Sequence, residues 1–134
     1  MMTNEELIMT TLKNMELRPE LDSDGNIVVC YQMKNITFLV GENDQFVSVI
    51  FPQIRDISEG EDLLVMATCN KIVREIKFVK VYVDHTFKSV SAACEFYYNN
   101  DESLEMNIRK SLDILGFIRT VFRKDMMELS DSLK

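Results

Sequence analysis

The sequence predicts a single α+β domain, in which an antiparallel sheet is combined with helices in the order α-β-β-β-β-α-β-β-α. Two patterns support this: capping signals that precede helical stripes of apolar residues, and alternating apolar and polar residues in runs separated by short turns. Connections this short join antiparallel strands. A chain of 134 residues fits one domain. We place that domain at residues 1–124 and expect residues 125–134 to form a frayed C-terminal tail.

The first helix is expected to begin at Thr3, because Thr3 and Glu6 have the spacing of a capping box. One side of this helix is apolar, with Leu7, Ile8, Leu12 and Met15 at helical spacing. Pro19 cannot donate a hydrogen bond to a neighbouring strand, and it favours extended backbone just before it. We therefore expect the helix to end there and a short edge strand to form near residues 17–22.

Residues 22–26 predict a turn, because Asp and Asn cap their own backbone and glycine accepts a positive φ. A calcium-binding loop is the alternative, but its glycine falls one position early and Met33 stands where the bidentate Glu belongs. Three strands should follow, with apolar residues on one face of residues 27–33, 36–40 and 46–51. We expect a hairpin turn at Lys34 and Asn35, and we expect Pro52 to stop the last of these strands.

The second half of the chain predicts a helix, a hairpin and a longer helix. Ser58 and Glu61 form a second capping box, ahead of an apolar stripe of Val65, Cys69, Ile72, Val73 and Ile76. Alternation over residues 78–84 and 88–98 predicts two strands that turn near His85 and Thr86. The polar residues 99–101 then cap a helix whose apolar residues are Leu104, Ile108, Leu112, Leu115, Ile118 and Phe122.

Charge and composition exclude several classes of function. With 22 acidic and 15 basic residues, the formal charge of −7 opposes binding to phosphate backbones. Arg119 and Arg123 belong to a basic side of the last helix, which we expect to be a solvated surface, so nucleic-acid binding is the third-ranked function. No signal or transit peptide is expected at the start, and no apolar run approaches the roughly 20 residues that span a bilayer. We therefore expect a cytoplasmic chain without a membrane partner.

Catalytic chemistry has little support in the sequence. His85 is the single histidine and falls in a predicted turn, where a solvated residue is more common than a catalytic base. Cys30, Cys69 and Cys94 lie in apolar surroundings and lack a C-x-x-C pair, which is typical of reduced, structural thiols. No carboxylates or imidazoles converge as metal ligands, and the glycines are isolated. We predict no catalytic residue, cofactor or metal; a small enzyme using Cys or carboxylate groups is the alternative.

Surplus apolar residues on residues 36–40 and 46–51 indicate an interaction surface. Val47, Val49 and Phe51 of the strand over residues 46–51, together with the middle helix, are the first candidates for the interface of a homodimer. The alternative is a monomer whose first and last helices cover one sheet face while the middle helix covers the other. Asn70, on the flank of the middle helix, is predicted to be structural by bonding a neighbouring backbone group, unless it is simply exposed.

The order of elements resembles the YbjN-like family, as do the segment Asp-Gly-Asn-Ile-Val followed by Thr-Phe-Leu-Val and the segment Cys69-Asn70-Lys71-Ile72. Members are labelled bacterial sensory transduction regulators, and Asn70 matches an asparagine of their second helix. The resemblance implies a type III secretion chaperone-like fold, with a twisted antiparallel sheet, three helices and homodimers that hold a partner protein. It brings no catalytic residue. The expected function is therefore a non-enzymatic protein-binding module, chaperone-like or regulatory, with a partner of unknown identity.

Overall fold

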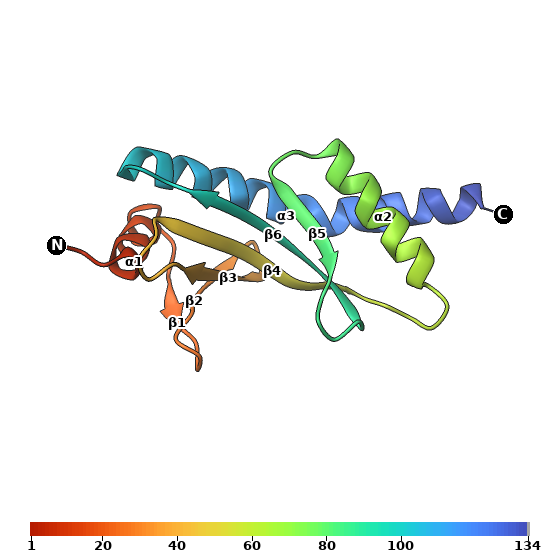
Figure 1. Ribbon diagram of the computed structural model, residues 1–134, viewed down its shortest axis with the longest axis horizontal. Helices are drawn as coiled ribbons and strands as arrows, with labels where there is room; N and C mark the ends of the chain where they lie inside the picture. Colours follow the sequence, from red (N-terminus) through yellow and green to blue (C-terminus); the bar gives the residue numbers. More distant parts are fainter. Residues whose placement is uncertain (134) are drawn as a thin grey trace.

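The computed structural model describes residues 1–133 and contains three helices and one six-stranded sheet (Figure 1). The elements are α1 (Asn4–Asn14), β1 (Glu20–Leu21), β2 (Ile27–Tyr31), β3 (Lys34–Val40), β4 (Phe46–Asp56), α2 (Asp62–Glu75), β5 (Val79–Val83), β6 (Ser89–Tyr97) and α3 (Asp101–Ser132). Both the α+β class and the order of elements are confirmed.

All strand pairs are antiparallel, in the spatial order β1-β2-β3-β4-β6-β5. The three helices cover the same face of this sheet. Asn4 of α1 accepts a hydrogen bond from the Tyr98 hydroxyl, and Ser111 of α3 is hydrogen-bonded to the Cys94 thiol. Side chains alternate between the two faces along a strand, so Cys94 and Tyr98, four residues apart, lie on the same face. Helix α2 packs against β5 and α3 on that side (Figure 1). The alternative arrangement, with α2 on the opposite face, is therefore wrong.

The core lies between this sheet face and the helices. Its largest fully buried side chains are Phe38, Phe122, Ile8, Leu12, Ile27, Ile36, Ile72, Leu104, Ile108, Leu112, Leu115 and Ile118. They come from all three helices and from β2 and β3, so one continuous core unites the chain. The opposite sheet face carries Cys30, Leu39 and Tyr97, which are exposed.

Local capping chemistry places several boundaries as expected. Thr3 caps α1: its Oγ1 accepts from the Glu6 N–H at 3.1 Å, and the full capping box is present. In the turn over residues 22–26, Asp22 Oδ1 accepts from the N–H groups of Asp24 and Asn26, both at 2.9 Å. These bonds confirm the turn, and β1 is a two-residue strand at the sheet edge.

The β2–β3 turn lies two residues earlier than expected. Gln32 and Met33 form it, with φ angles of 49° and 66°, whereas Lys34 pairs with Tyr31 in the sheet. Positive φ at both central positions is the pattern of a type I′ hairpin turn, whose twist matches that of the flanking strands, and here neither residue is a glycine. Met33 is consequently exposed and does not continue the apolar face of β2.

Strand β4 continues through Pro52 to Asp56 instead of stopping there. Its pairing with β6 shifts register between Phe51 and Arg55, and Gln53 has a φ of 54°. This β-bulge leaves the proline outside the ladder, where its missing N–H costs nothing.

Two helix boundaries also differ from the prediction. Helix α2 begins at Asp62, its N-cap is Glu61, and no side chain caps it, so the predicted capping box of Ser58 and Glu61 is wrong. The Glu61 N–H instead bonds the Ser58 carbonyl in a turn, and the Glu61 carboxylate accepts from the Ser58 N–H at 2.9 Å. Helix α3 reaches Ser132, and its residues Asp125 and Met126 are buried. The predicted fraying of residues 125–134 is therefore wrong for residues 125–132, and residue 134 lies outside the described residues. Within residues 1–133, no helix has the length and apolarity needed to cross a membrane.

Candidate protein-binding groove

Helix α2 has apolar residues on both of its sides. Its inner side is buried through Val65, Thr68, Cys69 and Ile72. Its outer side exposes Leu63 to 81%, Met66 to 58% and Val73 to 42% of their surface. We call these three residues the α2 stripe. A surface helix of a monomer ordinarily turns polar residues to solvent, whereas the α2 stripe is apolar surface that residues 1–133 leave exposed.

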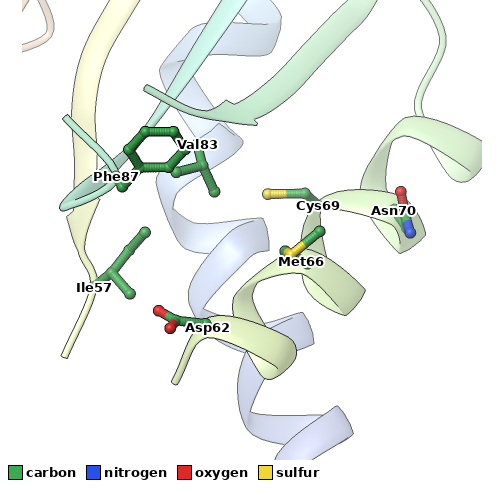
Figure 2. A pocket seen from close by; sticks show the side chains of 7 residues that line it. All are labelled: Ile57, Asp62, Met66, Cys69, Asn70, Val83 and Phe87. Carbon is green, nitrogen blue, oxygen red and sulfur yellow. The ribbon is translucent and has the colours of Figure 1, made fainter. Parts of the chain in front are cut away.

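A cavity of about 480 Å³ lies between α2 and the β5–β6 hairpin, beside the α2 stripe. Its lining residues are Ile57, Asp62, Met66, Cys69, Asn70, Val83 and Phe87. Figure 2 shows Val83 and Phe87 on one side, facing Met66 and Cys69 of α2 on the other. Because Met66 belongs to both the stripe and the cavity wall, the two form one continuous apolar surface, which we call the α2 groove.

Phe87, which lines this groove, has a strained backbone conformation. It is 79% exposed, and its φ of 62° is a conformation that bulky side chains rarely adopt. The turn around it is fixed by Asp84, which accepts from the Thr86 N–H at 3.0 Å and from the hydroxyls of Ser89 and Thr86. These hydrogen bonds hold the pKa of Asp84 below its usual range, and the bond from the Ser89 hydroxyl has the largest effect. Such strain is concentrated at functional sites.

The polar groups of the cavity lie at its rim. Asn70 is exposed, and among residues 1–133 its amide has no hydrogen-bond partner. The prediction that Asn70 bonds a neighbouring backbone group is therefore wrong, and the exposed alternative is correct. Asp62 is likewise exposed and makes no ion pair within the described part of the chain. The rim thus offers one carboxylate and one amide to an incoming molecule.

The predicted interface residues Val47, Val49 and Phe51 are buried in the core and face the helices. In the β4–β6 ladder, Val47 is opposite Phe96 and Val49 is opposite Cys94. The sequence predicts that side chains of β4 alternate between the two sheet faces. Which alternate set of residues faces the helices depends on the pairing of β4 with β6. The expectation that these three residues are an exposed interface is wrong.

The three cysteines and the single histidine lie in different environments. Burial raises the pKa of the Cys69 thiol to about 11, and burial raises that of Cys94 to about 11 as well, against a smaller lowering by Ser111. Both thiols are protonated near neutral pH, so neither is an activated nucleophile. Cys30 is exposed on the open sheet face, and His85 is exposed in the β5–β6 turn. Residues 1–133 contain no cluster of three potential metal ligands.

The chain is thus an α+β domain with its three helices on one face of an antiparallel sheet. In this architecture the chain is similar to YbjN from E. coli, described as "a putative transcription regulator", with a TM-score of 0.64, 11% identity and coverage of 91% of this chain and 90% of that chain. An uncharacterized protein from Methanothermobacter thermautotrophicus matches with a TM-score of 0.46, 16% identity and coverage of 89% and 99%. Neither a family model nor a curated protein matches the chain. The chain has a YbjN-like fold, which confirms the resemblance at the level of fold.

Proposed function

We propose that this chain is a non-enzymatic protein-binding module, chaperone-like or regulatory, that binds its partner in the α2 groove. One observation carries the proposal: the exposed α2 stripe continues into a cavity of about 480 Å³ beside Phe87. Exposed aromatic and methionine side chains around an apolar cavity are typical of surfaces that receive a partner's side chain.

The groove favours a partner segment with apolar anchors and a positive charge. Its long direction follows α2, so an amphipathic helix with anchors at a spacing of three or four residues can lie along the α2 stripe. Asp62 at the rim supplies a carboxylate that makes no ion pair with the described residues 1–133, and the formal charge of the whole chain is −7. A lysine or arginine next to the apolar anchor complements both.

The state of the cysteines supports a non-enzymatic function. Cys69 is the thiol at the cavity wall, and a pKa of about 11 keeps it protonated. If any activity is found, separate replacement of Cys30, Cys69, Cys94 and His85 tests this point. An activity that depends on one of these side chains would contradict the non-enzymatic proposal.

We further propose that two copies pair through the α2 stripe when no partner occupies the groove. A two-fold axis places the stripe of one copy against the stripe of the other, so one contact covers both. Helix α2 takes this role because the strand residues Val47, Val49 and Phe51 are already covered by the chain's own helices.

Site-specific photo-crosslinking tests the groove. A photo-reactive phenylalanine analogue is placed at Leu63 in the groove or at Met106, which is comparably exposed on α3. In the native cell, we expect position 63 to give a discrete adduct with one partner protein and position 106 to give none. The purified partner should then bind Phe87→Ser about tenfold more weakly, because an anchoring aromatic is lost. Identical adducts at both positions, or unchanged binding by Phe87→Ser, would contradict the proposal.

A further inference from the structure

Three arginines line a separate cavity of about 230 Å³ where the end of β4 meets α3. They are Arg55, Arg119 and Arg123, and the remaining wall is formed by Ile54 and Phe122. Arg119 and Arg123 are four residues apart, so they lie on the same side of α3. The cavity therefore concentrates positive charge in a chain whose formal charge is −7.

Arg119 is oriented by two contacts that carry no negative charge. Its Nε donates to the Ile54 carbonyl at 3.1 Å, and its guanidinium lies 4.9 Å from the centroid of the Phe51 ring. Both contacts orient the guanidinium, but neither supplies a negative charge. Arg123 is exposed and makes no ion pair with any residue in 1–133.

Arg55 has a carboxylate partner but keeps an unused donor. Its Nη2 contacts the two carboxylate oxygens of Glu61 at 3.0 and 3.3 Å. Its Nε is buried and has no acceptor among the described residues. A buried donor left without an acceptor is costly, so Arg55 keeps one unsatisfied hydrogen-bond donor in the wall residues of this cavity.

The charges select the kind of ligand. Glu61 compensates Arg55, which leaves Arg119 and Arg123 without an ion-pair partner among residues 1–133. A phosphate monoester carries about −1.5 to −2 charges at neutral pH, and its oxygens suit the planar guanidinium fork. We propose that this cavity binds the phosphate group of a small phosphorylated molecule.

The neighbouring carboxylates restrict the ligand to a small one. An adjoining cavity shares Arg55 and Arg123 but adds the carboxylates of Glu61 and Asp131. A nucleic-acid backbone crossing this surface would bring its next phosphates towards those carboxylates, which repel them. A single phosphate group in the arginine-lined cavity avoids this repulsion.

Amide chemical shifts measured by NMR during a titration with inorganic phosphate test the proposal, with ionic strength held constant by chloride. We expect saturable shifts at residues around Ile54 and Arg119. Arg123→Gln should weaken phosphate binding about tenfold, because it removes a charged donor without disturbing the core. Arg109→Gln is the matched control, since Arg109 is an exposed arginine of the same helix outside this cavity, and it should bind phosphate as the wild type does.

Arg119→Gln provides a second variant, which should also weaken phosphate binding, with circular dichroism as the check of its fold. Absence of saturable shifts in the wild type would overturn the proposal, as would equal effects of Arg123→Gln and Arg109→Gln. A short DNA duplex is the remaining probe. If it binds at the same residues more tightly than phosphate and loses affinity in Arg123→Gln, the surface binds nucleic acid and the small-molecule proposal is overturned.

Discussion

At the first residue of α1, the Asn4 side chain joins three parts of the chain. Its Nδ2 donates to the carbonyls of Gly41 and Asp44, both at 2.9 Å, and its Oδ1 accepts from the buried Tyr98 hydroxyl at 3.1 Å. Asn4→Ala removes all three bonds and leaves the Tyr98 hydroxyl without its partner. We expect the free energy of unfolding, measured with urea, to fall by about 1–3 kcal/mol.

Asn70→Ala is the control for this measurement, because the exposed Asn70 amide has no hydrogen-bond partner among residues 1–133. Its unfolding free energy should match that of the wild type. Equal losses in the two variants would contradict the structural role of Asn4. The sequence suggested Asn70 for this role because its flank of α2 is apolar, whereas the bonds of Asn4 reach residues 37, 40 and 94 positions away.

Three carboxylates make stability depend on acid pH. The hydrogen bond from the Ser58 backbone chiefly lowers the pKa of Glu61, and the bond from the Ser89 hydroxyl chiefly lowers that of Asp84. The bond from Lys80 chiefly lowers the pKa of Glu95. A carboxylate whose pKa is lower in the folded state stabilises the fold above its ordinary value, here 4.5 for Glu and 3.8 for Asp. That contribution is lost as the pH falls through the lowered pKa.

We therefore expect the urea midpoint to be constant near neutral pH and to decrease once the pH falls below about 4.5. Glu95→Gln should decrease less steeply over this acid range, because one titrating group is removed. Glu102 is exposed on α3 and makes no ion pair among residues 1–133, so Glu102→Gln serves as the comparison and should keep the wild-type slope. Identical slopes for Glu95→Gln and the wild type would contradict the assignment.

At the scale of single elements, the β2–β3 turn contains strain that a glycine should relieve. Met33 has a φ of 66° and is almost fully exposed, so its side chain contributes little packing. We expect Met33→Gly to raise the free energy of unfolding by about 1 kcal/mol, because glycine adopts positive φ without steric cost. Met33→Ala keeps the Cβ and should give no comparable gain in the same urea experiment; an equal gain would mean that the strain lies elsewhere.

The last turns of α3 are part of the core. Met126 is 5% exposed, whereas the neighbouring Met127 is 61% exposed. Met126→Ala should lower the free energy of unfolding by about 2 kcal/mol or more, because it leaves a cavity beneath α3. Met127→Ala makes the same chemical change at the surface and should be nearly neutral. If both variants unfold like the wild type, this end of α3 does not contribute to stability.

The sequence predicts those elements whose determinants are local. Thr3 bonds a backbone N–H three residues away, so its spacing from Glu6 predicts the cap of α1. Asn100, which caps α3, belongs to the polar residues 99–101 that predict this cap. The bulge at Pro52 and the orientation of Val49 towards the helices depend on pairing with β6, which lies about forty residues further along the chain. Neither the α2 groove nor the arginine-lined cavity follows from any single segment, because each combines a helix with a distant strand or turn.

For the whole molecule, placing all helices on one sheet face determines which apolar surfaces stay open. Helices α1 and α3 are covered along their inner sides by the sheet, and α2 extends this layer over β5 at the sheet edge. An edge helix has neighbours on fewer sides than a central one, which leaves the α2 stripe uncovered. The long α3 runs along the molecule, and the C-terminal part of α3 packs against α2 (Figure 1). The Lys71–Asp125 ion pair at 2.9 Å joins the two helices there.

This arrangement makes the oligomeric state a test of the α2 stripe. If two copies pair through it, light scattering at micromolar concentration should give twice the chain mass of 15.6 kDa. A double variant with Leu63→Glu and Met66→Glu places like charges across the two-fold axis, so it should give a mass near 15.6 kDa with an unchanged circular dichroism spectrum. Tyr97→Glu changes an exposed residue of the open sheet face and should leave the dimer intact. A mass of 15.6 kDa for the wild type at every dilution would reject the homodimer, and loss of the dimer in Tyr97→Glu alone would move the interface from α2 to the open sheet face.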